Sequence, residues 1–252
     1  MYTIYIPKRQ REKEEHEITK VIRTYLKLRP DTSGVICFPG YMSRNQWIEE
    51  YWHGLFDNYL KSELYVSFSQ GMSGEDIKRQ NIQYIMENPI HNLKYLDLAI
   101  PNLRDHSKVM LFYKKNSDIS LYELCNKEDC PTSENPLETF IKNCDVEAAL
   151  LGSSNQSFST YFKPATYGET DIMLIACDHD NNTGCSDSDT VFINDVRRDT
   201  PYNSVDFNMK NCVVAKSINF TTDDEGKSFL KGIAMDLLGI KQSEVIDDSS
   251  QR

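Results

Sequence analysis

A histidine and a lysine lie two positions apart at the start of an apolar run, where they could act on a phosphate group. His106 and Lys108 open a strand predicted over residues 108–113. Residues i and i+2 of a strand point to the same face, so the two side chains share a side. The imidazole could attack phosphorus or transfer a proton, and the ammonium could hold anionic oxygens. A histidine held by a neighbour at the strand edge is the structural alternative.

Hydrogen-bond donors follow a second apolar strand, predicted over residues 146–151. Gly152 comes next and is expected to let the chain turn sharply. Ser153 and Asn155 then present a hydroxyl and an amide on one side of the chain. These groups could bind phosphate oxygens, although an ordinary polar turn would use the same residue types.

Two acidic residues lie at the start of a further strand, predicted over residues 171–177. Glu169 and Asp171 are separated by one threonine. Either carboxylate could accept the Nδ1–H of His106 and so fix which ring nitrogen attacks. Both residues stay open as candidates, and Asp171 could equally be the polar first residue of the strand.

Together these segments resemble the signature of the phospholipase D superfamily. The resemblance rests on His106-x-Lys108, Gly152-Ser-x-Asn155 and an acidic residue before a strand, and it spans residues 93–176. Only one copy of the signature is present. Single-copy members are homodimers with the active site on the two-fold axis, so the resemblance implies a homodimer with a shared active site.

The resemblance also implies a role for each residue. His106 would be the nucleophile that forms a phosphohistidine, and the partner's His106 would protonate the leaving oxygen and later activate water. Lys108 and Asn155, assisted by Ser153, would stabilise the charge on the non-bridging oxygens. Glu169, or Asp171 in its place, would orient His106. This chemistry calls for no metal and no other cofactor.

Two departures from the family pattern narrow the expected activity. The family commonly has an aspartate five residues after the lysine, where this chain has Tyr113, and residues 116–143 form an insertion between the two motifs. Both features favour the divergent nucleases, in particular restriction endonucleases of phospholipase D type, and the insertion could gate or read a substrate. We therefore expect a metal-independent DNA endonuclease. A lipid or small-molecule phosphodiesterase and a catalytically silent binding subunit are the alternatives.

Strands alternate with helices along the chain, which predicts an α/β fold with one mixed central β-sheet flanked by helices. Residues 1–240 are expected to form a single domain of phospholipase D type, followed by a polar tail over residues 241–252. Besides the three strands above, strands are predicted at 34–39, 63–69, 93–100, 189–193 and 212–218. Helices are predicted at 43–59, at 74–87 and at about 221–238, where Gly239 ends the last one.

Charge is distributed unevenly along the chain. The formal net charge of -10 excludes a broad basic surface of the kind that non-specific nucleic-acid binders use. Residues 1–30 nevertheless hold eight basic and four acidic side chains, a balance of +4. The basic segment 8–29 could contact a phosphate backbone, but a solvated helix face is the favoured interpretation. In a dimer, two copies of His106 and Lys108 would form a local basic cleft.

Cysteine usage and hydropathy indicate a cytoplasmic protein without a membrane partner. The seven cysteines are an odd number, no secretory signal precedes them, and no apolar run is long enough to span a membrane. Two cysteine groups, Cys177/His179/Cys185 and Cys125/Cys130/Cys144, lack the paired Cys-x2-Cys spacing of zinc sites. A calcium-like run from Asp178 has Thr183 where the loop requires glycine. No metal site is expected.

Overall fold

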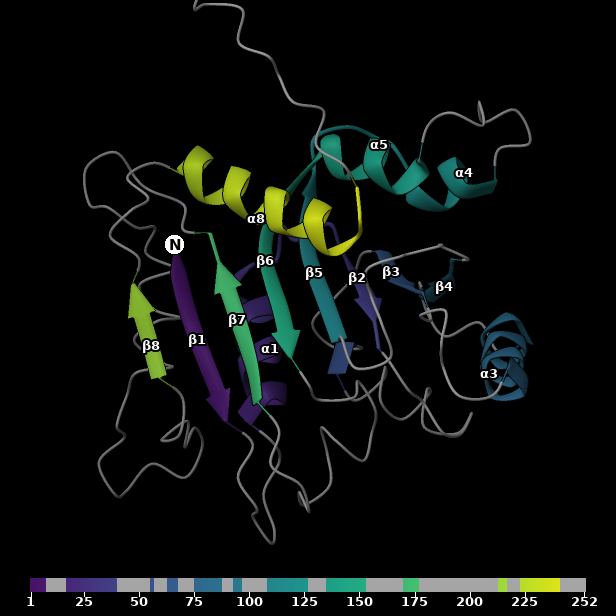
Figure 1. The fold of residues 1–252 in the computed structure, drawn as a ribbon, viewed down its shortest axis with the longest axis horizontal. Helices are drawn as coiled ribbons and strands as arrows, with labels where there is room; N and C mark the ends of the chain where they lie inside the picture. Colours follow the sequence, from purple (N-terminus) through teal and green to yellow (C-terminus); the bar gives the residue numbers. More distant parts are fainter. Residues whose placement is uncertain are drawn as a thin grey trace, which may run out of the picture.

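The computed structural model describes eleven parts of the chain: residues 1–7, 17–39, 55–56, 63–67, 75–87, 93–96, 108–126, 135–152, 170–176, 213–216 and 223–240. Within these parts the centre of the fold is one eight-stranded mixed sheet in the order β4-β3-β2-β5-β6-β7-β1-β8 (Figure 1). Strands β2, β3 and β4 are mutually parallel, and every other neighbouring pair is antiparallel.

The element bounds follow the apolar segments of the sequence. The strands are β1 (Tyr2–Pro7), β2 (Gly34–Phe38), β3 (Glu63–Val66), β4 (Leu93–Tyr95), β5 (Lys108–Lys115), β6 (Cys144–Gly152), β7 (Thr170–Ile175) and β8 (Val213–Lys216). The helices are α1 (Glu17–Leu28), α3 (Glu75–Glu87), α4 (Leu121–Asn126), α5 (Pro136–Lys142) and α8 (Asp223–Leu237). Residues 55–56 are also helical.

One face of the sheet packs against α1, which lies behind the strands in Figure 1. The apolar side chains of α1 repeat at helical spacing, so they form one stripe that enters the core. Every second residue of the central strands points to the same side. The α1 residues fully or almost fully buried in this first core are Ile18, Val21, Ile22, Tyr25 and Leu26.

The opposite face forms a second core with α4, α5 and α8 (Figure 1). Helix α5 begins with Asn135, whose side chain accepts a 3.0 Å hydrogen bond from the Leu137 amide. Helix α8 ends at Gly239, which has a φ of 68°. The Ile240 amide donates back to the Met235 carbonyl at 2.9 Å, which closes the helix with a Schellman motif.

The predicted mixed α/β sheet flanked by helices is confirmed. Seven of the observed strands and helices α3 and α8 coincide with predicted segments to within a few residues. Of the predicted helix 43–59, the structure describes only Leu55 and Phe56, which are helical and buried. The predicted strand at 189–193 and the predicted tail lie outside the described residues.

The N-terminal region differs from the sequence-based interpretation. Strand β1, which the sequence analysis did not predict, lies between β7 and β8. Segment 8–29 is favoured by its sequence as a solvated helix face, and its described part has both an apolar stripe buried in the first core and a polar flank. Arg29 is also buried, at 5% exposure. Only the polar flank of α1, with Lys27 exposed, reaches the surface.

The insertion 116–143 connects β5 to β6 at the end of the sheet opposite Lys108. Its described parts contain α4 and α5, which pack over the second core. Lys115 pairs with Cys144 at that end, whereas Lys108 pairs with Gly152 at the other. Strand β5 places about 23 Å between its two ends. The expectation that the insertion gates or reads a substrate at Lys108 therefore does not fit its described part within one protomer.

Among the described residues, no helix is long and apolar enough to cross a membrane.

Candidate active site at the start of β5

Three residues of the predicted site lie in one row across neighbouring strands. Lys108 begins β5 and pairs with Gly152, the last residue of β6. Gly152 pairs in turn with Asp171, the second residue of β7. The row lies at the end of the sheet where β2 finishes and β5 starts, which is the lower end in Figure 1.

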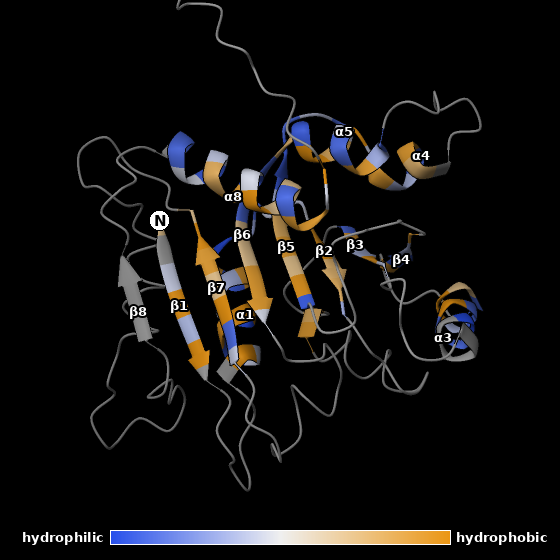
Figure 2. Ribbon diagram, viewed as in Figure 1, coloured by the Kyte–Doolittle hydropathy of each residue, from blue (hydrophilic) through white to orange (hydrophobic). Residues whose placement is uncertain are grey.

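Lys108 and Asp171 share the face of the sheet that packs on α1. Directly paired residues of antiparallel strands point to the same side. Lys108 is two and four residues from Met110 and Phe112, so it points to the same face as these residues of the first core. Asp171 is likewise in phase with Met173 and Ile175 of the same core. In Figure 2, hydrophilic colour returns at the lower ends of β5 and β7, below the apolar middle of the sheet.

Both charged side chains are almost fully buried. Lys108 is 6% exposed and Asp171 is 2% exposed. Removing an ammonium or a carboxylate from water is costly unless an opposite charge and hydrogen bonds compensate it. Two opposite charges therefore lie on one buried face, at the end of these strands, and form a polar site beside an apolar core.

Gly152 leaves space for the Asp171 carboxyl group. A β-carbon at residue 152 would collide with Asp171 Oδ1 and would lie 2.6 Å from its Cγ and 2.9 Å from its Cα. The Asp171 carboxyl thus lies directly over the Gly152 backbone of β6. Gly152 is the last residue of β6, and this close approach requires that it lack a side chain; the sharp turn expected after it lies outside the described residues.

The apolar pattern of the strands explains why these residues come together. Residues 109–113 and 146–150 are buried on both faces, which pins the pairing of β5 with β6. Pairing of β6 with β7 from Gly152↔Asp171 to Ala148↔Ile175 then sets Asp171 opposite the glycine. A slip of one residue would turn Asp171 away from the α1 face.

Four of the six predicted site residues lie outside the described residues: His106, Ser153, Asn155 and Glu169. The sequence joins them to the described row by short stretches of chain. Ser153 is bonded to Gly152 and Glu169 is bonded to Thr170, and His106 precedes Lys108 by two residues. Of the predicted set, the structure brings Lys108 and Asp171 together on one face.

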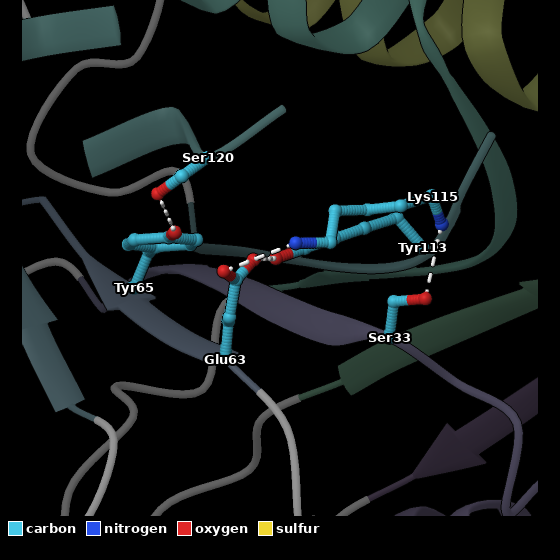
Figure 3. Close-up of polar contacts among 6 residues, drawn as sticks. All are labelled: Ser33, Glu63, Tyr65, Tyr113, Lys115 and Ser120. Atoms are coloured by element: carbon cyan, nitrogen blue, oxygen red, sulfur yellow. Dashed lines mark hydrogen bonds and ion pairs between the residues drawn. The ribbon is translucent and has the colours of Figure 1, made fainter. Parts of the chain in front are cut away.

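Tyr113, at the position where the resembled family has an aspartate, belongs to the other end of β5. Its side chain is buried in the second core. The Tyr113 hydroxyl donates a 3.1 Å hydrogen bond to Glu63 Oε2 (Figure 3). The Tyr113 ring also packs edge-on against Phe140, with 5.1 Å between the ring centroids. Burial and the Glu63 carboxylate raise the pKa of Tyr113 well above its ordinary value. Tyr113 is therefore a structural residue at a distance from Lys108.

Glu63 is the centre of a polar cluster that sequence reasoning missed. Lys115 Nζ lies 3.1 Å from Glu63 Oε1, and the Lys115 amide donates to Ser33 Oγ at 3.0 Å (Figure 3). Nearby, Tyr65 and Ser120 share a 3.3 Å hydrogen bond. The partners are distant in sequence, so no local motif announces the cluster. Its donors and acceptors satisfy one another, as is expected of polar groups that stabilise a fold.

The described parts of the chain offer no metal site. They contain no group of three or more histidine, cysteine, aspartate or glutamate side chains that could hold a metal ion. Cys37, Cys125 and Cys144 are free thiols there. Burial raises the pKa of Cys144 to about 12. The remaining residues of the cysteine groups considered for zinc, and the calcium-like run, lie outside the described residues.

Comparisons with known proteins give weak similarities. No protein-family model matches the sequence, and no curated protein matches it. Among solved structures, the chain is similar to polyphosphate kinase from Porphyromonas gingivalis, with a TM-score of 0.34 and 14% identity over 69% of this chain and 22% of that one. It is also similar to the yeast tyrosyl-DNA phosphodiesterase, with a TM-score of 0.31 and 12% identity over 67% of this chain and 31% of that one. This chain spans less than a third of either protein, and similarity at this level assigns it to no family.

Proposed function

We propose that this chain is a metal-independent phosphodiesterase whose active site is built around Lys108. The observation that carries the proposal is the buried row Lys108–Gly152–Asp171 at one end of the sheet. An ammonium held there is suited to stabilise the charge of a phosphate diester as it reacts. The segments bonded to this row carry His106, Ser153 and Asn155, which supply the nucleophile and further donors of the resembled signature.

The proposed reaction passes through a phosphohistidine. The His106 imidazole forms a nitrogen–phosphorus bond while the phosphorus–oxygen bond to the leaving group breaks, and the partner's His106 gives that oxygen a proton. Water then breaks the nitrogen–phosphorus bond, and the partner's His106 takes the proton from water. Lys108, Asn155 and Ser153 hold the non-bridging oxygens in both steps.

DNA is the proposed substrate, and a homodimer is the proposed assembly. A single copy of the signature supplies only one histidine, whereas the reaction needs both a nucleophile and an acid. In a dimer the two copies of His106 and Lys108 would converge on one substrate, which would give a local phosphate-binding site in a chain of net charge -10. A restriction or defence endonuclease fits a protein that binds DNA through such a local site.

The connection between β6 and β7 is the proposed location of substrate contacts. It leaves the sheet at Gly152 and returns at Thr170, so both of its ends lie at the same end of the sheet as Lys108. The described part of the insertion lies at the opposite end and takes no part in this proposal.

Cleavage of DNA in excess EDTA tests the proposed function. We expect the wild-type chain to cut DNA without added metal, and His106→Ala to lower the rate by at least about 10⁴-fold because the nucleophile is lost. Lys114→Met is the matched control, since Lys114 lies on the same strand with an exposed side chain. A requirement for magnesium, or full activity of His106→Ala, would contradict the proposal. Hydrolysis of phosphatidylcholine vesicles without DNA cleavage would assign a lipid substrate instead.

A further inference from the structure

Among the described helices, α1 alone has more basic than acidic side chains. It carries three basic residues and one acidic residue, a balance of +2. On the opposite face of the sheet, α8 has two basic and four acidic residues, a balance of -2. On that same face α4 has a single acidic residue and α5 is neutral. The helices on the two faces of the sheet (Figure 1) therefore have opposite charge.

The basic residues of α1 lie on the side of the helix that is turned away from the sheet. Lys20, Arg23 and Lys27 follow one another at spacings of three and four residues, so they share one side of the helix. The apolar residues of α1 occupy the other side and are buried in the first core. Lys27 is exposed, and Lys20 and Arg23 are half-buried. We call these three residues the basic stripe.

The basic stripe runs along the sheet toward the end where Lys108 lies. The Tyr25 ring packs edge-on against Phe112, with 5.1 Å between the ring centroids, so the second half of α1 lies over the far end of β5. The chain then enters β2 at that same far end. Lys20 precedes Tyr25 by five residues, or about 7.5 Å of helix, and is therefore nearer to the Lys108 end. Lys108 points to the same face of the sheet that α1 covers.

An acidic residue near the end of α1 does not cancel the charge of the stripe. Asp31 follows the helix, and its carboxylate pairs with the Lys114 ammonium at 2.6 Å. That pair adds no net charge. The positive balance of α1 therefore persists on this face of the sheet.

We propose that the basic stripe is a docking surface for the sugar–phosphate backbone of duplex DNA. The inference rests on the proposed function for its substrate, and it names the surface that guides this substrate toward Lys108. Neutralisation of phosphates by basic side chains releases counterions, which drives binding. From Lys20 to Lys27 the stripe is about 10 Å long, which matches about three phosphates of one strand along the DNA axis. The acidic helices on the opposite face repel the same backbone.

The salt dependence of DNA binding tests the docking surface. Anisotropy of a short fluorescent duplex is measured in EDTA, with His106→Ala as the background so that the duplex stays uncut. The variant Lys20→Gln/Arg23→Gln/Lys27→Gln should weaken binding at least about tenfold at about 50 mM salt. It should also reduce the slope of log affinity against log salt by about 2.7, because each lost phosphate contact removes about 0.9. An unchanged slope would overturn the proposal.

A second triple variant removes the same charge from the opposite face. Lys94→Gln/Lys142→Gln/Lys227→Gln is suitable because these residues lie on β4, α5 and α8, and the Lys94 ammonium lies 4.8 Å from the ring centroid of Tyr122 in α4. We expect this variant to change the affinity by less than about threefold. An equal loss in the two triple variants would show that net charge alone decides binding, and would overturn the docking surface.

The single substitution Lys27→Gln keeps the test decisive if the stripe variant does not fold. Lys27 is exposed, so its loss should leave the Tm within about 3 °C and reduce the salt slope by about 0.9. A slope equal to that of the unsubstituted chain would contradict the proposal. Binding to anionic lipid vesicles without binding to the duplex would also overturn DNA as the partner.

Cleavage assays separate the docking surface from the chemistry. In a chain with His106 intact, the stripe variant should raise KM for DNA more than it lowers kcat, because the stripe binds substrate away from the reacting atoms. DNA binding that depends on the stripe, without cleavage by the wild-type chain, would refute the proposed function and support the docking surface. Cleavage with the same KM in the stripe variant as in the wild-type chain would refute the docking surface alone.

Discussion

The two ends of β5 each bury polar side chains, but in different surroundings. At the Lys115 end, Glu63 binds both Tyr113 and Lys115, and α5 packs over the cluster. At the Lys108 end, two opposite charges flank a glycine on the face of the sheet that packs on α1. The first arrangement is complete within the described fold. The second lies where the segments that carry the nucleophile and donor residues join the sheet. Burial of charge alone therefore does not identify an active site; its place relative to reactive residues does.

The largest expected difference between the two ends is in catalysis. Lys108→Met should lower kcat/KM for DNA cleavage by about 10²–10³-fold, because it removes a charge that stabilises the reacting phosphate. Lys115→Met should leave kcat/KM within about twofold, since Lys115 contacts Glu63 at the far end. Steady-state assays of both variants in EDTA decide this. Equal losses in the two variants would remove the proposed distinction.

Gly34 of β2 pairs with Tyr113 at the Lys115 end of the sheet, so a substitution there should affect stability and not activity. A β-carbon on Gly34 would lie 2.6 Å from the Glu63 carbonyl oxygen and would collide with the Tyr113 hydroxyl. Gly34→Ala should therefore lower the free energy of unfolding by about 3 kcal/mol, or the Tm by roughly 6–12 °C, and leave kcat per folded molecule unchanged. Denaturant and thermal unfolding measure the first effect. Retained stability in Gly34→Ala would show that the cluster can move aside.

Alkaline pH should destabilise the Lys115 end. Burial raises the pKa of Tyr65 to about 12 from an ordinary 10, and it raises the pKa of Tyr113 further. The neutral phenols are favoured in the folded state, so this stability is complete below pH 10 and is lost as the pH rises from 10 to 12. Unfolding monitored between pH 9 and 12 should show this loss. The variant Tyr65→Phe should show a smaller loss, and an equal one would contradict the assignment.

The smallest expected effect concerns the exposed ion pair of β5. The Lys114 ammonium lowers the pKa of Asp31 below its ordinary value. Asp31→Asn should change the free energy of unfolding by less than about 1 kcal/mol, and the change should shrink further in 1 M salt. Chemical unfolding at low and high salt measures it. A large effect independent of salt would show that exposure does not weaken this pair.

The central strands could be predicted from the sequence, because a continuous apolar run indicates a strand that is buried on both faces of the sheet. Lys108 could be chosen as a candidate from its spacing to His106 at the start of such a run, and Asp171 as the alternative to Glu169 at the start of another. The role of Gly152 could not be predicted, since it depends on the register between β6 and β7. Strand β1 could have been predicted, because Ile4 and Ile6 are two positions apart and both point into the core. The basic residues that follow the strand make this short pattern easy to miss.

The Glu63 cluster shows what local patterns leave out. Its partners Tyr113 and Lys115 lie on a strand about fifty positions further along the chain, and the two strands are separated in the sheet by β2. Such contacts depend on how the whole sheet assembles. The same holds for α5, whose cap at Asn135 is readable in the sequence but whose packing on Tyr113 is not.

Trapping the covalent intermediate tests the central claim most directly. Wild-type protein is mixed with a DNA substrate in EDTA, quenched within the first turnover and digested, and the peptide that contains residue 106 is examined by mass spectrometry. The account predicts a nucleotide phosphoramidate on His106 that appears before product and is absent in His106→Ala. DNA cleavage in EDTA without any adduct on His106, or with an adduct on another residue, would contradict it.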